Sequence, residues 1–187
     1  MTEMNTDLTP HLADQLTFHW DHHLSPRLAG LTDEEYFWEP VASCWSVRPR
    51  GTSTAPVQAG SGDFTVDFAM PEPEPAPVTT IAWRIGHIVV GVLGERNHSH
   101  FGGPPVDYAT FEYAGTAEQA LAQLDEHYRR WITAVGALTV KELWTPVGPS
   151  EGPFADAPMV DLVLHIHREV IHHGAELCLL RDLYAHR

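Results

Sequence analysis

Apolar residues recur every three or four positions along four long stretches of the chain, which is the spacing of one face of an α-helix. We therefore expect helices over about residues 9–30, 79–98, 116–135 and 157–184. The last stretch carries the clearest stripe, which consists of Leu162, Ile166, Val170, His173, Leu177, Leu180 and Tyr184. Four amphipathic helices predict an all-α fold, an antiparallel four-helix bundle.

Residues that commonly begin and end helices set these limits. Thr9 is expected to cap the first helix, with Pro10 in its first turn and Gly30 just past its end. Thr116 and Gln119 form a capping-box pattern at the start of the third helix.

Residues 48–78 break the helical pattern, because they are rich in Pro, Gly and Ser, and no helix tolerates such a density of proline. Phe64, Val66 and Phe68 alternate with polar residues, which permits a short strand. We interpret the segment as a long excursion between the first two helices of a single domain over residues 1–187. The alternative, a linker between two domains, agrees less well with the sequence, because the residues on either side do not form a complete core alone.

The formal net charge is −14 at pH 7, which argues against nucleic acid and against an anionic membrane surface as partners. No apolar run has the length of a membrane span, and the N-terminus does not resemble a signal peptide. The two cysteines form no CxxC pair, which is typical of free thiols in a reducing compartment. We therefore expect a cytoplasmic protein.

The fourth helix contains a candidate metal site. Glu169 and His173 are four residues apart, so they share a helix face, and His173 lies on the apolar stripe. A buried carboxylate beside a buried imidazole is costly unless a partner such as a divalent cation compensates it. His87, beside the stripe of the second helix, is the candidate third ligand. Two imidazoles and one carboxylate leave a coordination position open for water or substrate. The alternative is a plain Glu–His hydrogen bond on a helix surface.

Two other histidine patterns compete with this site. His19 and His23 are also four apart and could bind a metal or line the pocket. Segments 95–98 and 169–172 both read Glu-x-x-His, the motif that holds two irons in ferritin-like bundles. The first of these segments falls at the end of the second helix, which favours the site with one metal.

Four sequence segments resemble the DinB-like family, which includes the metal domain of mycothiol-dependent maleylpyruvate isomerases. They are FHWDHHLSPRLAGLTDEEYFWEPV, CWSVRP, TIAWRIGHI and HREVIHHGAELCLLRDLY. The family pattern places one histidine on helix two and a His-or-Glu-x-x-x-His pair on helix four, which here corresponds to His87, Glu169 and His173. The resemblance implies a four-helix bundle, an open site for zinc or nickel, and often a homodimer.

The resemblance also implies a function, a thiol-dependent transferase or isomerase that uses a small-molecule substrate and a low-molecular-weight thiol such as mycothiol. His172, His23 and Glu176 are the candidate catalytic residues for proton transfer. Arg84 and Arg168 are the candidates for binding an anionic group of the thiol or substrate. The alternatives are a metal-dependent hydrolase that uses bound water, and a binding module without catalytic activity.

Overall fold

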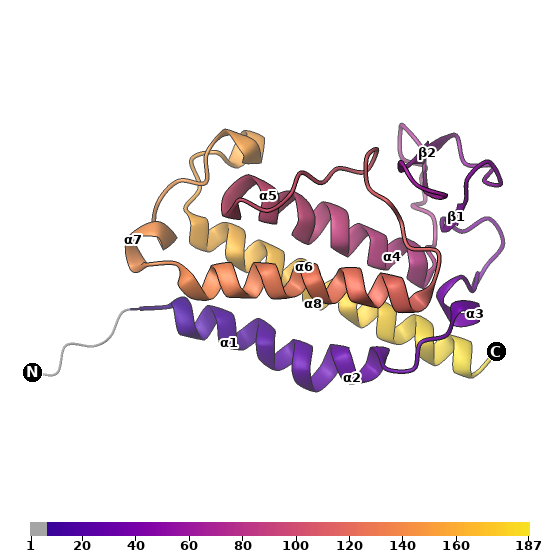
Figure 1. The fold of residues 1–187 in the computed structure, drawn as a ribbon, viewed down its shortest axis with the longest axis horizontal. Helices are drawn as coiled ribbons and strands as arrows, with labels where there is room; N and C mark the ends of the chain where they lie inside the picture. The colour runs from indigo at the N-terminus through magenta and orange to yellow at the C-terminus, as the bar shows by residue number, and fades with distance from the viewer. Residues whose placement is uncertain (1–6) are drawn as a thin grey trace, which may run out of the picture.

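The computed structural model describes residues 7–187, and it is mostly helical, with four long helical stretches packed side by side (Figure 1). The predicted four-helix architecture is confirmed, although residues 1–6 of the predicted domain lie outside the described part. The first and fourth stretches run in one direction along the bundle and the other two run in the opposite direction. The stretches are α1 (Thr9–His19), η1 (Trp20–Leu24) and α2 (Ser25–Leu28); α4 (Ile81–His87), η2 (Ile88–Gly94) and α5 (Glu95–Phe101); α6 (Ala117–Ala137); and α8 (Met159–Ala185).

The first two stretches each contain a π-helical segment, η1 and η2, where the hydrogen bonds span one residue more than in an α-helix. The expected cap at Thr9 is wrong. Leu8 occupies the N-cap position, and the Thr9 hydroxyl donates a hydrogen bond to the Leu138 carbonyl across the bundle (3.0 Å). Pro10 lies in the first turn, as expected. The cap at Thr116 is confirmed, since its hydroxyl accepts from the Gln119 N–H.

All four stretches contribute side chains to one core. Trp131 of α6 is completely buried, and Leu16, Ile88 and Val163 from the other three stretches are equally enclosed. Burying apolar area of this kind supplies most of the free energy that favours folding. Between α6 and α8 lie the short helices α7 (Val140–Leu143) and η3 (Pro149–Phe154). No helix within residues 7–187 is both long and apolar enough to cross a membrane.

The excursion contains a small antiparallel sheet, which follows the short helix α3 (Asp33–Tyr36). Its strands are β1 (Val47–Pro49), β2 (Val57–Ala59) and β3 (Phe64–Phe68), in the order β1-β3-β2. The strand predicted from Phe64 to Phe68 is thus confirmed as the central one. In Figure 1 the sheet lies at one end of the bundle, beside the start of α4.

An aromatic cluster joins this sheet to α4. The ring of Phe68 lies 5.7 Å from that of Trp83 and 5.8 Å from that of Trp45, measured between centroids. The Trp83 indole N–H donates to the Asp67 carbonyl (2.8 Å), so the sheet holds this side chain by packing and by a hydrogen bond. Because Trp83 is one turn before His87 in α4, the sheet bears directly on the position of that histidine.

Candidate metal centre

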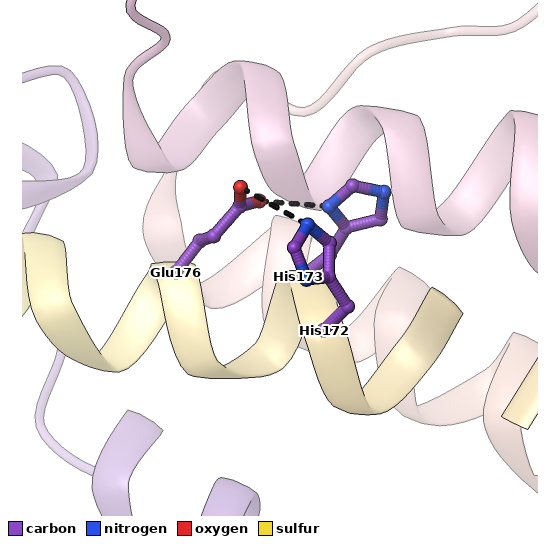
Figure 2. Close-up of side chains that lie close together, drawn as sticks. All are labelled: His172, His173 and Glu176. Atoms are coloured by element: carbon purple, nitrogen blue, oxygen red, sulfur yellow. Dashed lines mark hydrogen bonds and ion pairs between the residues drawn. The ribbon is translucent and has the colours of Figure 1, made fainter. Parts of the chain in front are cut away.

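Two consecutive histidines and a glutamate one turn later on α8 form a candidate His₂Glu metal site, which consists of His172, His173 and Glu176 (Figure 2). One potential ligand atom from each lies within 4.8 Å of the others. The Glu176 carboxylate lies 2.7 Å from Nδ1 of His173 and 3.5 Å from Nε2 of His172. Of these three residues the sequence predicts only His173 as a ligand, and it predicts His172 and Glu176 as candidates for proton transfer.

The other two predicted ligands lie around His173. His87, at the end of α4, approaches it edge-to-face, with the ring centroids 4.8 Å apart at 84°. Glu169, one turn earlier on α8, places Oε2 3.5 Å from Nε2 of His173. His87 and Glu169 thus each lie against His173, but the three together are not a group whose ligand atoms all lie within 4.8 Å of one another, as those of His172, His173 and Glu176 do.

His173 is buried and His87 is half-buried, and each imidazole has one nitrogen beside a neighbouring oxygen. Nδ1 of His87 lies 2.8 Å from the Tyr108 hydroxyl, and Nδ1 of His173 bonds to Glu176. The other nitrogen of His87, Nε2, has no hydrogen-bond partner within residues 7–187, and that of His173 lies beside Glu169. Histidines that bind metals commonly hold their second nitrogen in this way, which fixes the ring and its tautomer.

Tyr108 was not singled out from the sequence. It lies on the loop between α5 and α6, and nothing in its local pattern marks it. It reaches His87 because residue 91 of η2 is a glycine, and a Cβ there would collide with the Tyr108 hydroxyl. π-Helical turns often occur at functional sites, and η2 begins at Ile88, directly after His87.

Both imidazoles have a lowered pKa and are neutral at pH 7. Burial, with smaller contributions from His173, Arg84 and Arg96, lowers the pKa of His87 to about 3. Burial also lowers the pKa of His173, although its hydrogen bond to Glu176 opposes this. Since a metal binds the neutral form of histidine, both side chains are in the state that a cation requires.

The two arginines that were candidates for binding an anion have different surroundings. Arg84 is half-buried, places Nε 2.9 Å from Glu176, and lies over the Trp83 ring. Its charge is therefore already paired with a carboxylate within the site. Arg168 is exposed, with Nη2 2.6 Å from Nδ1 of His165 and Nε 3.6 Å from Glu169. Of the two, Arg168 is the one whose charge faces solvent.

The two candidate catalytic histidines are both exposed. His172 lies at the edge of the centre, beside Glu176. The structure does not bring His23 into the centre, because its ring contacts are with Phe18 and His19 of its own helical stretch.

The two competing metal patterns form no cluster of three ligands in the described part of the chain. The rings of His19 and His23 stack with their centroids 5.8 Å apart, without a third ligand. Glu95 pairs with Arg96 (2.9 Å), and Nδ1 of His98 lies 2.9 Å from the Gly103 carbonyl.

A family model described as the DinB superfamily matches residues 15–177. No curated protein matches the chain, and no solved structure matches it.

Proposed function

The chain belongs to the DinB superfamily, and on that premise we propose that it binds one divalent metal ion through His87, Glu169 and His173 and acts as a thiol-dependent transferase or isomerase. The observation that carries the proposal is the orientation of the two neutral imidazoles. Nδ1 of His87 lies beside the Tyr108 hydroxyl, and Nδ1 of His173 lies 2.7 Å from Glu176 and 3.4 Å from Nη1 of Arg84. With the proton on each Nδ1, Nε2 of each ring is the nitrogen that can accept a cation.

We prefer this ligand set to His172, His173 and Glu176, the group of three whose ligand atoms the structure brings within 4.8 Å, for two reasons. His172 and His173 are consecutive, so their side chains leave the helix about 100° apart, and the side chain of His172 is 64% exposed. Glu176 is already paired with Arg84, and a cation bound to Glu176 would lie close to that positive charge. In the proposed set, Glu176 instead orients His173 from outside the ligands.

A divalent cation held there would supply a Lewis acid that lowers the pKa of a thiol or a water molecule bound at the open position. The chain's own residues would bind the cation, fix the imidazole rings and exclude water from the side of α4. His172, at the exposed edge, is suited to carry a proton between the centre and solvent. Zinc is the proposed metal and nickel is the second choice, since this donor set accepts several divalent ions.

The ligand set is tested by elemental analysis of protein purified without a histidine tag and reconstituted with zinc. About one metal per chain is expected for a three-ligand site of this kind, and His87→Ala and Glu169→Gln should lose it. The matched variant His172→Ala should retain it. Retention by His87→Ala, or loss in His172→Ala, would assign the metal to the α8 group and overturn the proposed ligands.

The thiol-dependent activity is tested on the cobalt(II)-loaded chain. Adding N-acetylcysteine should produce a near-ultraviolet sulfur-to-cobalt charge-transfer band, and turnover of an electrophile such as monochlorobimane should require the thiol. Ester hydrolysis without thiol would instead support a metal-dependent hydrolase. Metal binding with neither the band nor turnover would support a binding module.

A further inference from the structure

A pocket of about 570 Å³ has none of the proposed metal ligands in its lining, but its lining residues His165 and Arg168 lie within 4 Å of Glu169. It is bounded by η3 and the loop around it, by the first half of α8, and by Arg96 of α5. Its volume is within the range of sites that enclose small organic molecules. Neither the sequence patterns nor the superfamily match assigns it an occupant.

The wall formed by the loop is largely apolar. Val147, Pro153 and Phe154 come from this loop, and Leu162 faces them from α8. The Phe154 side chain is 71% exposed, which is unusual for an aromatic ring held in an ordered loop. Since exposed aromatic groups in concave sites commonly mark binding surfaces, an apolar body of a ligand suits this wall.

The charges that line the pocket are not equally available. Arg96 is paired with Glu95 (2.9 Å) and Glu151 (3.4 Å), and Glu151 also bonds to Nε2 of His100 (2.9 Å). This network pairs one guanidinium with two carboxylates, so Arg96 has no charge left over for a ligand.

Arg168 differs, because its side chain is 68% exposed and its nearest acidic oxygen, on Glu169, is 3.6 Å away. Its hydrogen bond to His165 uses only Nη2, so donors on the guanidinium remain for a carboxylate.

Glu169 connects this pocket to the metal centre. Its Oε1 faces Arg168 and lies 3.7 Å from Nδ1 of His165, whereas its Oε2 faces His173. At the opposite end, Asp161 lines the pocket two turns before Arg168, about 10 Å along α8 at 1.5 Å per residue. An anionic group is therefore repelled at the far end and attracted at the end beside the centre.

We propose that this pocket binds a small organic carboxylate with an apolar body, as the co-substrate of the metal centre. The carboxylate pairs with Arg168, and the body packs on Phe154 and Leu162. The co-substrate role rests on the proposed function, but binding itself does not require the metal. A cation on Glu169 would neutralise the carboxylate that competes for Arg168, so metal loading should tighten binding.

The proposal is tested by calorimetric titration of phenylacetate into the metal-free and the zinc-loaded chain, with neutral phenylacetamide as the matched ligand. Arg168→Gln should weaken phenylacetate binding at least about tenfold, because a hydrogen bond between charged groups is lost. Phe154→Ala should weaken both ligands. Arg129→Gln removes the same charge from an exposed position on α6 and should leave binding unchanged.

Three results would overturn the carboxylate site: no phenylacetate binding, equal binding of phenylacetamide, or equal behaviour of Arg168→Gln and Arg129→Gln. Binding that depends on Arg168 and tightens with zinc would support both the pocket and the centre. Binding that depends on Arg168 but ignores zinc would support the pocket and contradict a metal on Glu169. The side chains of Arg168 and Phe154 are exposed, so replacing either one removes no packing from the core.

Discussion

Tyr108 holds His87 through a single hydrogen bond, and the absence of a side chain at Gly91 makes that contact sterically feasible. Burial raises the pKa of the Tyr108 hydroxyl, so it stays protonated and neutral at physiological pH. A neutral hydroxyl oxygen can accept a hydrogen bond from Nδ1–H of His87, which leaves the Nε2 lone pair for a metal. Two residues that belong to no ligand motif thus control one proposed ligand.

We expect Tyr108→Phe to weaken zinc affinity about 10- to 100-fold, the usual effect of removing a hydrogen bond to a ligand. Gly91→Ala should weaken it as well, because the added methyl group displaces the tyrosine. Tyr113→Phe is the matched control, since the Tyr113 hydroxyl bonds to the Tyr108 carbonyl and not to His87. The measurement is competition with a chelator, and equal affinities in all three variants would contradict the role of Tyr108.

His167 gives the fold a sensitivity to acid. It is 1% exposed, its ring nitrogens have no hydrogen-bond partners in the described structure, and burial lowers its pKa from 6.5 to about 4. The folded protein therefore favours the neutral ring, so this contribution to stability is complete above pH 6.5 and is lost as the pH falls towards 4.

Replacing His167 with Phe should remove that loss, which amounts to about 3 kcal/mol for a shift of this size. Urea unfolding at pH 7 and at pH 4.5 measures the effect. The parent chain should lose more stability between the two pH values than the variant does. Equal losses would show that the buried imidazole does not contribute.

At the scale of elements, sequence patterns predicted helices better than they predicted their irregularities. Thr116 caps α6 as expected, because its side-chain contact is local. Thr9 does not cap α1, because its hydroxyl finds a partner on the distant residue Leu138. The π-helical segments gave no signal, since apolar spacing hardly distinguishes one extra residue in a turn. Of the three strands only β3 was predicted, because β1 and β2 are too short to show alternation.

The sheet should influence the metal centre although it contributes none of the proposed ligands. Phe68 contacts Trp83 and Tyr108, with ring centroids 5.7 and 5.1 Å apart, and both of those side chains touch His87. Phe68→Ala should lower zinc affinity by roughly tenfold while the helical circular dichroism is retained. Val57, which pairs with Phe68 but is exposed, is the control as Val57→Ala. Unchanged zinc affinity in Phe68→Ala would show that the sheet does not influence metal binding.

For the molecule as a whole, the proposed ligands lie on two helical stretches that are distant in sequence, so a bound cation would cross-link α4 and α8. Free zinc at 100 times its dissociation constant should stabilise the fold by about 2.7 kcal/mol. For a chain of this size, the thermal midpoint should rise by about 5–10 °C. His87→Ala should abolish the rise and His172→Ala should keep it. A rise in both variants would contradict the cross-link through His87.

The sequence predicts His87, Glu169 and His173 as ligands because two of them share a helix face and the third lies in a recognisable segment, and this set stays a prediction. Of the group His172, His173 and Glu176, whose ligand atoms lie together in the structure, only His173 was predicted as a ligand. The surroundings of these residues were not predicted. Tyr108 is 21 residues after His87 on an irregular loop, and the pocket wall comes from η3, which has no ligand motif. Tertiary packing determines which loop covers which helix face, and the spacing of apolar residues along the chain does not predict it.

The residues that flank the three-stranded sheet are hydrogen-bonded to each other. The Trp45 N–H donates to the Val78 carbonyl (3.0 Å), and the Thr80 N–H donates to the Trp45 carbonyl (2.9 Å). Residues 46–78 therefore leave the bundle and return to it at almost the same point, so they form an insertion whose two ends lie next to each other. Their length and sequence can change without altering the distance that the neighbouring helices must span. Replacing this insertion is therefore a way to change the position of Trp83, and with it His87, while the connections between the four helical stretches stay the same.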